Sequence, residues 1–203
     1  MYREKAEVIR VNTWPTQDAP KLSLDTVEAW REWLRDNHET SPGVWLVFWR
    51  KGSGREPLDY DECVREALCW GWIDGHTRVI DADRRGMWFT RRGRNSGWSA
   101  SNKARVADLA AAGRIQPAGQ AVIDDAQARG LWTLFDDAEA LIESPELAAA
   151  LDADPVARAN WDAFPPSARK VGLSQLALAK RPETKTKRIA TIVERAARNE
   201  RPA

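Results

Sequence analysis

The sequence has few of the residues on which metal and thiol chemistry depend. Its 203 residues include only two cysteines, Cys63 and Cys69, and two histidines, His38 and His76. No spacing among these four resembles a zinc site, so we expect no metal. No Gly-rich loop that opens a helix resembles a dinucleotide-binding or Walker motif, and we expect no cofactor. The segment GSGR at 52–55 is interpreted as a strand-to-helix loop, with phosphate binding as an open alternative.

Long hydrophobic segments are also missing. No apolar run reaches the roughly 18 to 20 residues that span a bilayer. The first ten residues, MYREKAEVIR, lack the apolar core of a secretory signal, so a cytoplasmic location is expected. Cys63 and Cys69 lie six residues apart in one predicted helix and point to different faces. We therefore predict two reduced, buried thiols rather than a disulfide.

Net charge is low but unevenly distributed. A formal charge of +1 argues against a protein that coats nucleic acid along its length. Residues 84–105, however, contain seven basic and no acidic residues, whereas 124–154 contain nine acidic residues and one arginine. Such segregation is typical of two solvated faces. The alternatives are an anionic ligand or nucleic acid at the basic segment 84–105, and a cationic peptide at the acidic segment 124–154.

The N-terminal part shows strand and helix signals in alternation. Residues 44–49, VWLVFW, form a continuous apolar run that predicts a central strand, and EVIRV at 7–11 predicts a short one. A helix between them, with Ser23 or Asp25 as N-cap, is expected to pack on the sheet. Its apolar face contains four side chains: Val27, Trp30, Trp33 and Leu34.

A second helix and a hairpin follow. Asp59 and Glu62 resemble a capping box, and Gly71 is expected to end the helix that they open. Residues 76–80 and 87–90 then predict two strands joined by the polar turn DADRRG.

From Ser99 onward the pattern is helical. Glycine and proline separate the segments, and Pro145, Pro155 and Pro182 each lie just inside a predicted helix start. The last helix has one apolar face formed by Ile189, Ile192, Val193 and Ala196. The predicted fold class is α+β: a small antiparallel or mixed sheet with helices over residues 1–97, then an all-helical part over 98–203 packed on the first as one compact unit.

The segment CWGWIDGHTRVI at 69–80 concentrates reactive side chains. Cys69, Asp74 and His76 together suggest an enzyme site, for which the turn after the helix must bring thiol and imidazole together. The commoner interpretation is a core thiol and an exposed imidazole. Asp74 is expected to cap a turn, with Gly75 at positive φ, and Arg78 is close enough in sequence to pair with Asp74.

Tryptophan is abundant, with 11 residues. Most are expected in the core, but Trp88 and Trp98 flank the basic stretch RRGRNSG, a composition by which proteins stack bases or bind anions. The alternative is that both indoles simply anchor the loop. The candidate ligand-binding residues are Trp72, Asp74, His76, Arg78, Arg91, Arg92, Ser96, Trp98, Asn102 and Lys103.

Several motifs resemble a known family. They are ALCWGWIDG at 67–75, the Ser-, Trp- and Asn-Lys-containing segment 89–103, PAG at 117–119, Gly-x-Trp at 130–132 and AKRPETKTKRI at 179–189. In this order they resemble the YdeI/OmpD-associated family, also called bacteriocin-protection proteins. Arg91, Gly93 and Arg94 depart from the residues common in that family, and 168–178 lacks its usual aromatic start.

The resemblance implies a bacterial cytoplasmic protein with a role in protection against bacteriocins or antimicrobial peptides. It implies no reaction, cofactor or catalytic residue. The leading hypothesis is a non-enzymatic binding protein with a pocket near the WIDG segment and the basic loop. Binding of nucleic acid or another anion through the segment 84–105, and an enzyme site around Cys69, Asp74 and His76, are the alternatives.

Overall fold

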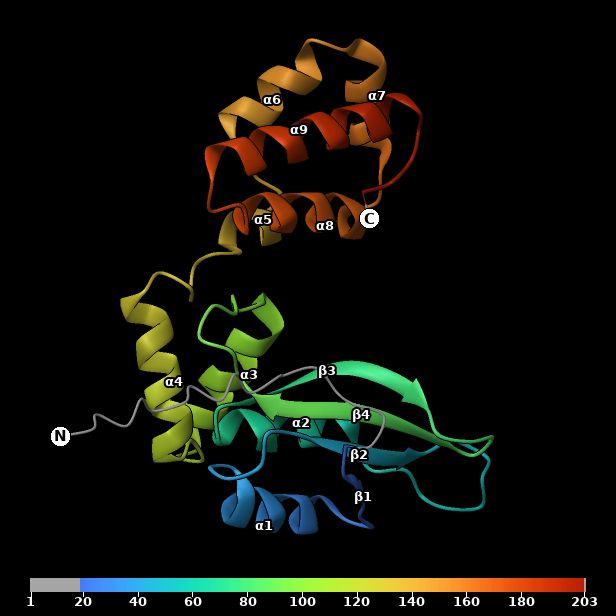
Figure 1. Ribbon diagram of the computed structural model, residues 1–203, viewed down its shortest axis with the longest axis vertical. Helices are drawn as coiled ribbons and strands as arrows, with labels where there is room; N and C mark the ends of the chain where they lie inside the picture. The colour runs from blue at the N-terminus through green and yellow to red at the C-terminus, as the bar shows by residue number, and fades with distance from the viewer. Residues whose placement is uncertain (1–18, 203) are drawn as a thin grey trace, which may run out of the picture. The chain divides into compact units, whose positions relative to one another are not determined.

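The computed structural model describes residues 19–202, and the strand predicted at 7–11 lies outside them. Contacts divide the chain into two compact units (Figure 1). Of the described residues, the N-terminal unit comprises 19–94 and 105–124, and the C-terminal unit comprises 95–104 and 125–202.

The N-terminal unit contains one mixed sheet. Its strands are β1 (Lys21–Ser23), β2 (Val44–Trp49), β3 (Trp72–Val79) and β4 (Arg84–Arg91), in the order β1-β2-β4-β3. β1 is parallel to β2, and the other pairs are antiparallel. The predicted central position of β2 is confirmed, and five of its six residues are buried. β1 was not predicted because its three residues are too few to show a periodic pattern.

Helix α1 (Val27–Asn37) packs on the sheet through its tryptophans. The ring of Trp30 lies 5.2 Å from that of Phe89, and its indole nitrogen donates to the Cys63 carbonyl at 3.0 Å. The predicted N-cap is wrong: Thr26, not Ser23 or Asp25, accepts a hydrogen bond from the Ala29 amide. A residue two positions before the first helical turn cannot reach these amides, so the immediately preceding hydroxyl caps the helix.

Helix α2 (Tyr60–Cys69) begins and ends as expected. The Asp59 carboxylate accepts a hydrogen bond from the Glu62 amide at 3.1 Å, as an N-cap does. Gly71 follows the helix with a φ of 73°, a conformation in which a Cβ is unfavourable. Cys63 and Cys69 are buried free thiols in this helix, as predicted.

The WIDG segment is a strand, which corrects the predicted turn. β3 starts at Trp72 and pairs with β4 from Trp72 opposite Arg91 onward, with a bulge between Asp74 and Thr77. Gly75 does not have positive φ. The backbone ladder to β4 outweighs the local turn preference of Asp-Gly, and the bulge absorbs the irregularity. The hairpin itself is confirmed, with strands longer than expected.

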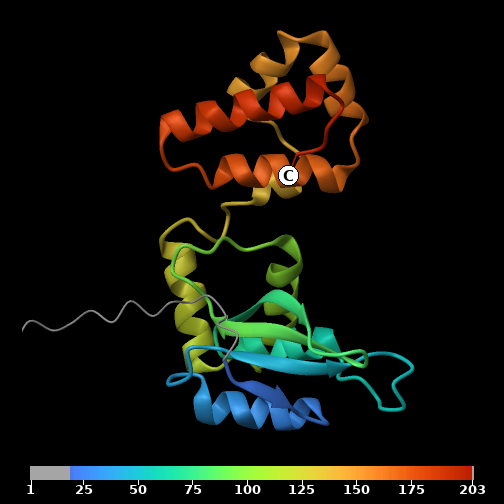
Figure 2. The same cartoon turned by 45° about the vertical axis from the view of Figure 1, so that its right-hand side comes forward.

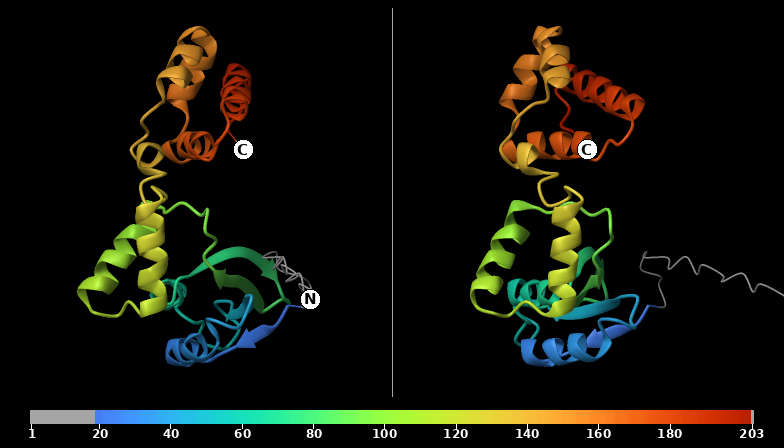
Figure 3. Two further views of the ribbon diagram at one scale, coloured as in Figure 1. Left: turned by 60° about the vertical axis from the view of Figure 1, so that its left-hand side comes forward. Right: turned by 90° about the vertical axis from the view of Figure 1, so that its left-hand side faces the viewer.

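Helices make up the rest of the described chain. They are α3 (Ala100–Ala111), α4 (Pro117–Ala128), α5 (Asp136–Glu139), α6 (Pro145–Asp152), α7 (Pro155–Ala163), α8 (Pro166–Ala177) and α9 (Pro182–Ala197). The three predicted proline starts are confirmed at α6, α7 and α9. α3 and α4 follow one another in the chain and are joined by residues 112–116 (Figure 3). The unit boundary crosses both, because residues 100–104 and 125–128 belong to the C-terminal unit.

The C-terminal unit has its own core. Helix α9 contacts α6, α7 and α8, and Figure 2 shows it between the α6–α7 pair and α8. Ile192 and Ala196 are buried, with Ile189 and Val193 packed against the same core, so the predicted apolar face is confirmed. Trp161 is fully buried, and its indole nitrogen donates to the Glu143 carboxylate at 2.7 Å.

Gly119 lets α4 approach the end of α2. A Cβ at Gly119 would lie 2.2 Å from the Cys69 carbonyl oxygen, closer than any Cβ contact that a structure tolerates. The Cys69 carbonyl also accepts a hydrogen bond from the Gln116 amide at 3.0 Å. One of the carbonyls that a helix end leaves without an intrahelical partner is thereby satisfied.

We predict that Gly119→Ala lowers the free energy of unfolding by roughly 1–3 kcal/mol, because backbone must move to admit the methyl group. Gly93→Ala is the matched control, since a Cβ at Gly93 meets nothing within 4 Å. It should change stability by less than about 0.5 kcal/mol. Urea denaturation measures both, and equal effects would contradict the close approach.

Candidate functional site

The predicted ligand-binding residues fall into two groups. Six lie in the N-terminal unit: Trp72, Asp74, His76, Arg78, Arg91 and Arg92. Four lie in the C-terminal unit: Ser96, Trp98, Asn102 and Lys103. Each group is therefore described within its own unit.

Trp72 and Asp74 have structural contacts. Trp72 is fully buried, and its indole nitrogen donates to the His38 carbonyl at 3.2 Å. The half-buried Asp74 carboxylate accepts a short hydrogen bond from the Tyr60 hydroxyl. Burial, followed by that hydrogen bond, raises the pKa of Tyr60 well above its usual value. The Tyr60 hydroxyl therefore stays protonated and joins α2 to β3.

Two arginines at the end of β4 border a small cavity. Arg92 is buried, and burial lowers the pKa of its guanidinium to about 10, with Asp74 opposing the shift. Arg91 donates to the Glu39 carbonyl at 3.1 Å. Both line a cavity of about 240 Å³ together with Trp70 and its neighbours. Asp74 is not among the residues that line this cavity.

His76 and Arg78 do not join Asp74. His76 is exposed within the bulge of β3. The guanidinium of Arg78 lies 5.1 Å from the centre of the Trp45 ring, a cation–π contact. The predicted ion pair between Arg78 and Asp74 is not among the contacts of the described residues. The strand conformation of WIDG explains this, because a strand does not fold back on itself as a turn would.

In the C-terminal unit the predicted residues form a packed corner. Trp98 is buried, with its ring 4.9 Å from that of Trp132. Lys103 forms an ion pair with Asp136 and lies 5.9 Å from the Trp132 ring. The backbone amide of Asn102 donates to the Ser99 hydroxyl at 3.3 Å. Ser96 is half-buried.

The basic segment 84–105 is not one loop. Residues 84–91 form β4 and residues from 100 onward belong to α3. Trp88 and Trp98, which flank its central part, are 5% and 1% exposed. Neither indole presents a face to a base, so the composition that suggested stacking reflects core packing instead.

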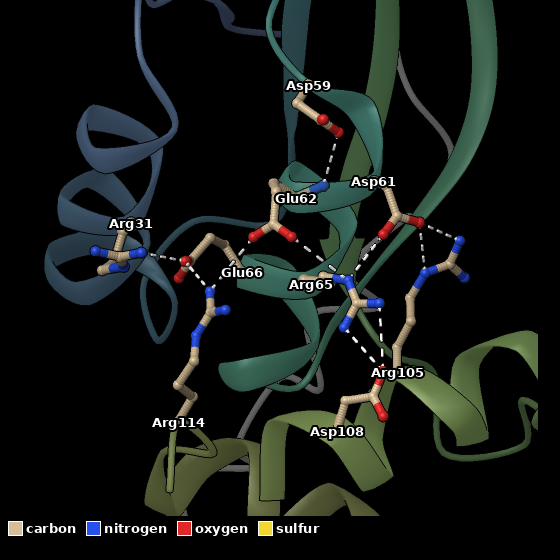
Figure 4. Close-up of polar contacts among 9 residues, drawn as sticks. All are labelled: Arg31, Asp59, Asp61, Glu62, Arg65, Glu66, Arg105, Asp108 and Arg114. Atoms are coloured by element: carbon tan, nitrogen blue, oxygen red, sulfur yellow. Dashed lines mark hydrogen bonds and ion pairs between the residues drawn. The ribbon is translucent and has the colours of Figure 1, made fainter. Parts of the chain in front are cut away.

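A network of charged side chains surrounds α2 in the N-terminal unit (Figure 4). Asp61 of α2 accepts hydrogen bonds from Arg65 of the same helix and from Arg105 of α3. Arg65 also reaches Asp108, at 3.3 Å. The pKa of Asp61 is lowered, first by its hydrogen bond to Arg65 and next by that to Arg105.

Glu66 is the buried member of this network. Its side chain is 2% exposed, and its Oε1 accepts from Arg31 of α1 and from Arg114, each at 2.5 Å (Figure 4). These three side chains border a cavity of about 530 Å³, together with Arg35, Glu32 and other neighbours. Because the carboxylates in its lining offset most of the arginine charge, the cavity has little net charge to offer a ligand.

The thiols are not activated. Burial raises the pKa of Cys69 to about 11 and that of Cys63 to about 12. Both remain thiols at neutral pH, whereas a nucleophilic cysteine needs a lowered pKa.

Residues 19–202 contain no group of three or more His, Cys, Asp or Glu side chains placed to hold a metal ion. None of their helices has the length and apolar character needed to cross a bilayer.

Most carboxylates of the acidic segment 124–154 have a cationic partner. Six of its nine acidic residues are in ion pairs: Asp125 with Arg129, Asp136 with Lys103, Glu139 with Lys170, Glu143 with Arg158, Glu146 with Lys185 and Asp152 with Arg158. Asp124 accepts a hydrogen bond from Gln120. Asp137 is exposed and has no side-chain partner among the described residues.

Asp137 borders a groove in the C-terminal unit. The groove has a volume of about 320 Å³ and is lined by Leu134, Asp137, Ala138, Ile142, Ser144, Leu173, Leu176, Ala177, Ala179 and Lys185. Lys185 is neutralised by Glu146 at 2.8 Å. Ile142 is 56% exposed, which is unusual for so large an aliphatic side chain. Leu173 and Leu176 of this lining are not singled out by the sequence, because their only local signal is helical spacing in α8.

Comparison with protein families assigns the two parts of the chain separately. Residues 140–199 match the model described as bacteriocin-protection, YdeI or OmpD-associated. This match covers less than a third of the 203 residues. Residues 22–122 match a different model, a domain of unknown function (DUF8412). No curated protein and no solved structure matches the chain.

The two matches refine the resemblance seen in the sequence. The motif at 179–189 lies in the segment that matches the bacteriocin-protection model, whereas ALCWGWIDG at 67–75 and PAG at 117–119 lie in the segment that matches the other model. Most of the groove-lining residues, from Ile142 to Lys185, fall within residues 140–199.

We predict that Asp74→Ala destabilises the fold by roughly 1–3 kcal/mol, because it leaves the half-buried Tyr60 hydroxyl without its acceptor. A double-mutant cycle with Tyr60→Phe, measured by urea denaturation, isolates the hydrogen bond and should give a coupling energy of about 1 kcal/mol. Strictly additive effects of the two substitutions would contradict its contribution.

A second prediction concerns the α2 network. Glu66→Ala should lower the free energy of unfolding by roughly 1–3 kcal/mol, because it removes two charge-assisted hydrogen bonds while the arginines left behind stay partly exposed. Glu62→Ala is the control on the same helix, at a side chain that is 43% exposed. Its effect should stay below about 1 kcal/mol. Thermal and urea denaturation would refute the prediction by giving similar values for the two variants.

Proposed function

We propose that this chain is a non-enzymatic binding protein of a bacteriocin- or antimicrobial-peptide-protection response, and that its C-terminal unit binds a cationic, partly apolar peptide in the groove beside Asp137. The observation that carries the proposal is the position of this groove, largely within residues 140–199, which match the bacteriocin-protection model. The description of that family model supports a protective role, and the lining of the groove supports the binding chemistry.

The lining of the groove favours a cationic segment with an apolar side chain. Leu134, Ile142, Leu173 and Leu176 provide apolar walls. The uncompensated carboxylate of Asp137 attracts positive charge, and the nearby Lys185 does not oppose it because Glu146 already neutralises it. An exposed ion pair adds little affinity by itself, so burial of the peptide's apolar side chain must supply most of it.

The other two hypotheses have weaker support. An enzyme site around Cys69, Asp74 and His76 requires an activated thiol, whereas burial raises the pKa of Cys69 to about 11. Base stacking on Trp88 and Trp98 requires exposed rings, and both are buried.

The proposal is tested by titrating the full chain with a synthetic cationic amphipathic peptide at low and at moderate salt, with calorimetry as the readout. We expect binding that weakens as salt rises, because the charge contribution is screened. Asp137→Asn should weaken binding about two- to fivefold at low salt, the range of one exposed ion pair. Ile142→Ser should also weaken it, by exposing a polar group in the apolar wall.

Glu194→Gln provides the matched control, since Glu194 is exposed on α9 and does not line the groove. It removes the same charge from the same unit and should leave affinity unchanged. Equal losses for Asp137→Asn and Glu194→Gln would show a nonspecific charge effect, and no binding at low salt would refute the proposal.

A further inference from the structure

Another cavity in the N-terminal unit is lined by cations, in contrast to the peptide groove beside Asp137. It has a volume of about 500 Å³ and is lined by Trp49, Arg50, Lys51, Pro57, Leu58 and Arg85. These residues come from the end of β2, the loop that follows it, and the start of β4. That loop and the β3–β4 turn lie at the same end of the sheet (Figure 1).

The lining contains three cations and no carboxylate. Arg50, Lys51 and Arg85 have no ion-pair partner within residues 19–202. Their neighbours differ: Arg84 pairs with Asp81 at 2.6 Å, and Arg55 lies 3.8 Å from Asp25. The two segments at this end, 50–56 and 81–85, together carry five basic and three acidic residues. Arg50, Lys51 and Arg85 line the cavity, whereas the acidic residues of the same segments, Glu56, Asp81 and Asp83, do not.

The backbone fixes where two of these cations lie. The Arg50 amide donates to the Asp83 carbonyl at 2.7 Å, which ties the loop to the hairpin. Arg85 is held in the sheet opposite Phe48. Gly52 and Gly54, with φ of 89° and 78°, turn the loop back after Lys51. Backbone hydrogen bonds therefore fix the positions at which the Arg50 and Arg85 side chains start.

An apolar wall accompanies the cations. Leu58 is buried, and Pro57 lies beside it in the lining. Trp49 also borders the cavity, and its ring contacts Arg55 and Arg84, whose guanidinium carbons lie 5.1 and 5.5 Å from its centre. The cavity lining therefore combines positive charge with apolar surface.

We propose that this cavity binds an organic phosphate, with the phosphate on Arg50, Lys51 and Arg85 and the organic part against Trp49, Pro57 and Leu58. Guanidinium groups bind phosphate through paired, charge-assisted hydrogen bonds, and the ammonium of lysine adds a compact positive charge. The larger cavity beside Glu66 lacks this property, because its arginines are already occupied by carboxylates. The site is independent of the peptide groove, since it lies in the other unit and takes a ligand of opposite charge.

Calorimetric titration of the full chain with adenosine triphosphate tests the site. Inorganic phosphate and a short single-stranded oligonucleotide form the other two arms. We expect binding of the nucleotide, weaker binding of inorganic phosphate because it leaves the apolar wall unused, and no preference for the oligonucleotide. Binding of the oligonucleotide alone would overturn the assignment to a small ligand, and no binding in any arm at low salt would overturn the site.

Variants locate the binding. Arg85→Gln and Lys51→Gln should each weaken nucleotide binding by roughly tenfold, the usual effect of losing one charge-assisted hydrogen bond. Arg85→Lys keeps the charge but removes the planar fork, and it should weaken binding severalfold. Arg35→Gln is the control, because Arg35 is exposed, pairs with Asp36 and does not line this cavity. Unchanged melting temperatures would show that the variants fold, and equal affinity in Arg85→Gln and Arg35→Gln would overturn the proposal.

Discussion

The N-terminal unit depends on one buried carboxylate. Glu66 of α2 is reached by Arg31 of α1 and by Arg114 of the connection between α3 and α4. A carboxylate that is only 2% exposed is costly to bury unless its partners are in place, so these three distant segments must assemble together. The tight approach of Gly119 to the Cys69 carbonyl, one turn further along α2, fixes the same junction. The cavity beside Glu66 is thus a by-product of a structural cluster.

Pairing of charges also decides which surfaces remain available for binding. The basic segment 84–105 does not form one positive face, because Arg84, Lys103 and Arg105 each have a carboxylate partner. Most carboxylates of 124–154 are occupied in the same way. Asp137 and the cations around Lys51 are among the charged groups without an ion-pair partner in residues 19–202, and each stands beside apolar surface. Such a combination is what a selective site for a charged organic ligand requires.

Local signals in the sequence predicted local structure well. The Asp59 cap, the apolar run of β2 and the proline helix starts each act over a few residues, and each is confirmed. The WIDG segment was misjudged because Asp-Gly favours a turn locally, whereas its partner strand β4 is more than ten residues away. Trp88 and Trp98 were likewise judged by their flanking arginines, although alternation along β4 places Trp88 next to Trp45 in the core.

The binding surfaces were harder to predict for the same reason. GSGR at 52–55 is typical of a strand-to-helix loop, and its local sequence leaves phosphate binding only as an alternative. The cavity becomes cationic only when the sheet brings Arg85 to Arg50 and Lys51 from a segment more than thirty residues away. In the C-terminal unit, Ile142 and Leu173 meet in the groove across a similar separation. Spacing in the sequence does not indicate which distant residues lie together in the folded chain.

A net charge of +1 has a further consequence for both proposed sites. With so little overall charge, the protein as a whole exerts almost no long-range field on an approaching ligand. Attraction must come from the local excess within about one Debye length, roughly 8–10 Å at moderate salt. The apolar walls then become decisive, because they are unaffected by screening and separate an organic phosphate from simple phosphate, or an amphipathic peptide from a merely basic one. Both sites should therefore select their ligands mainly by local shape and apolar contact. The charge of each site determines only whether the ligand must be cationic or anionic.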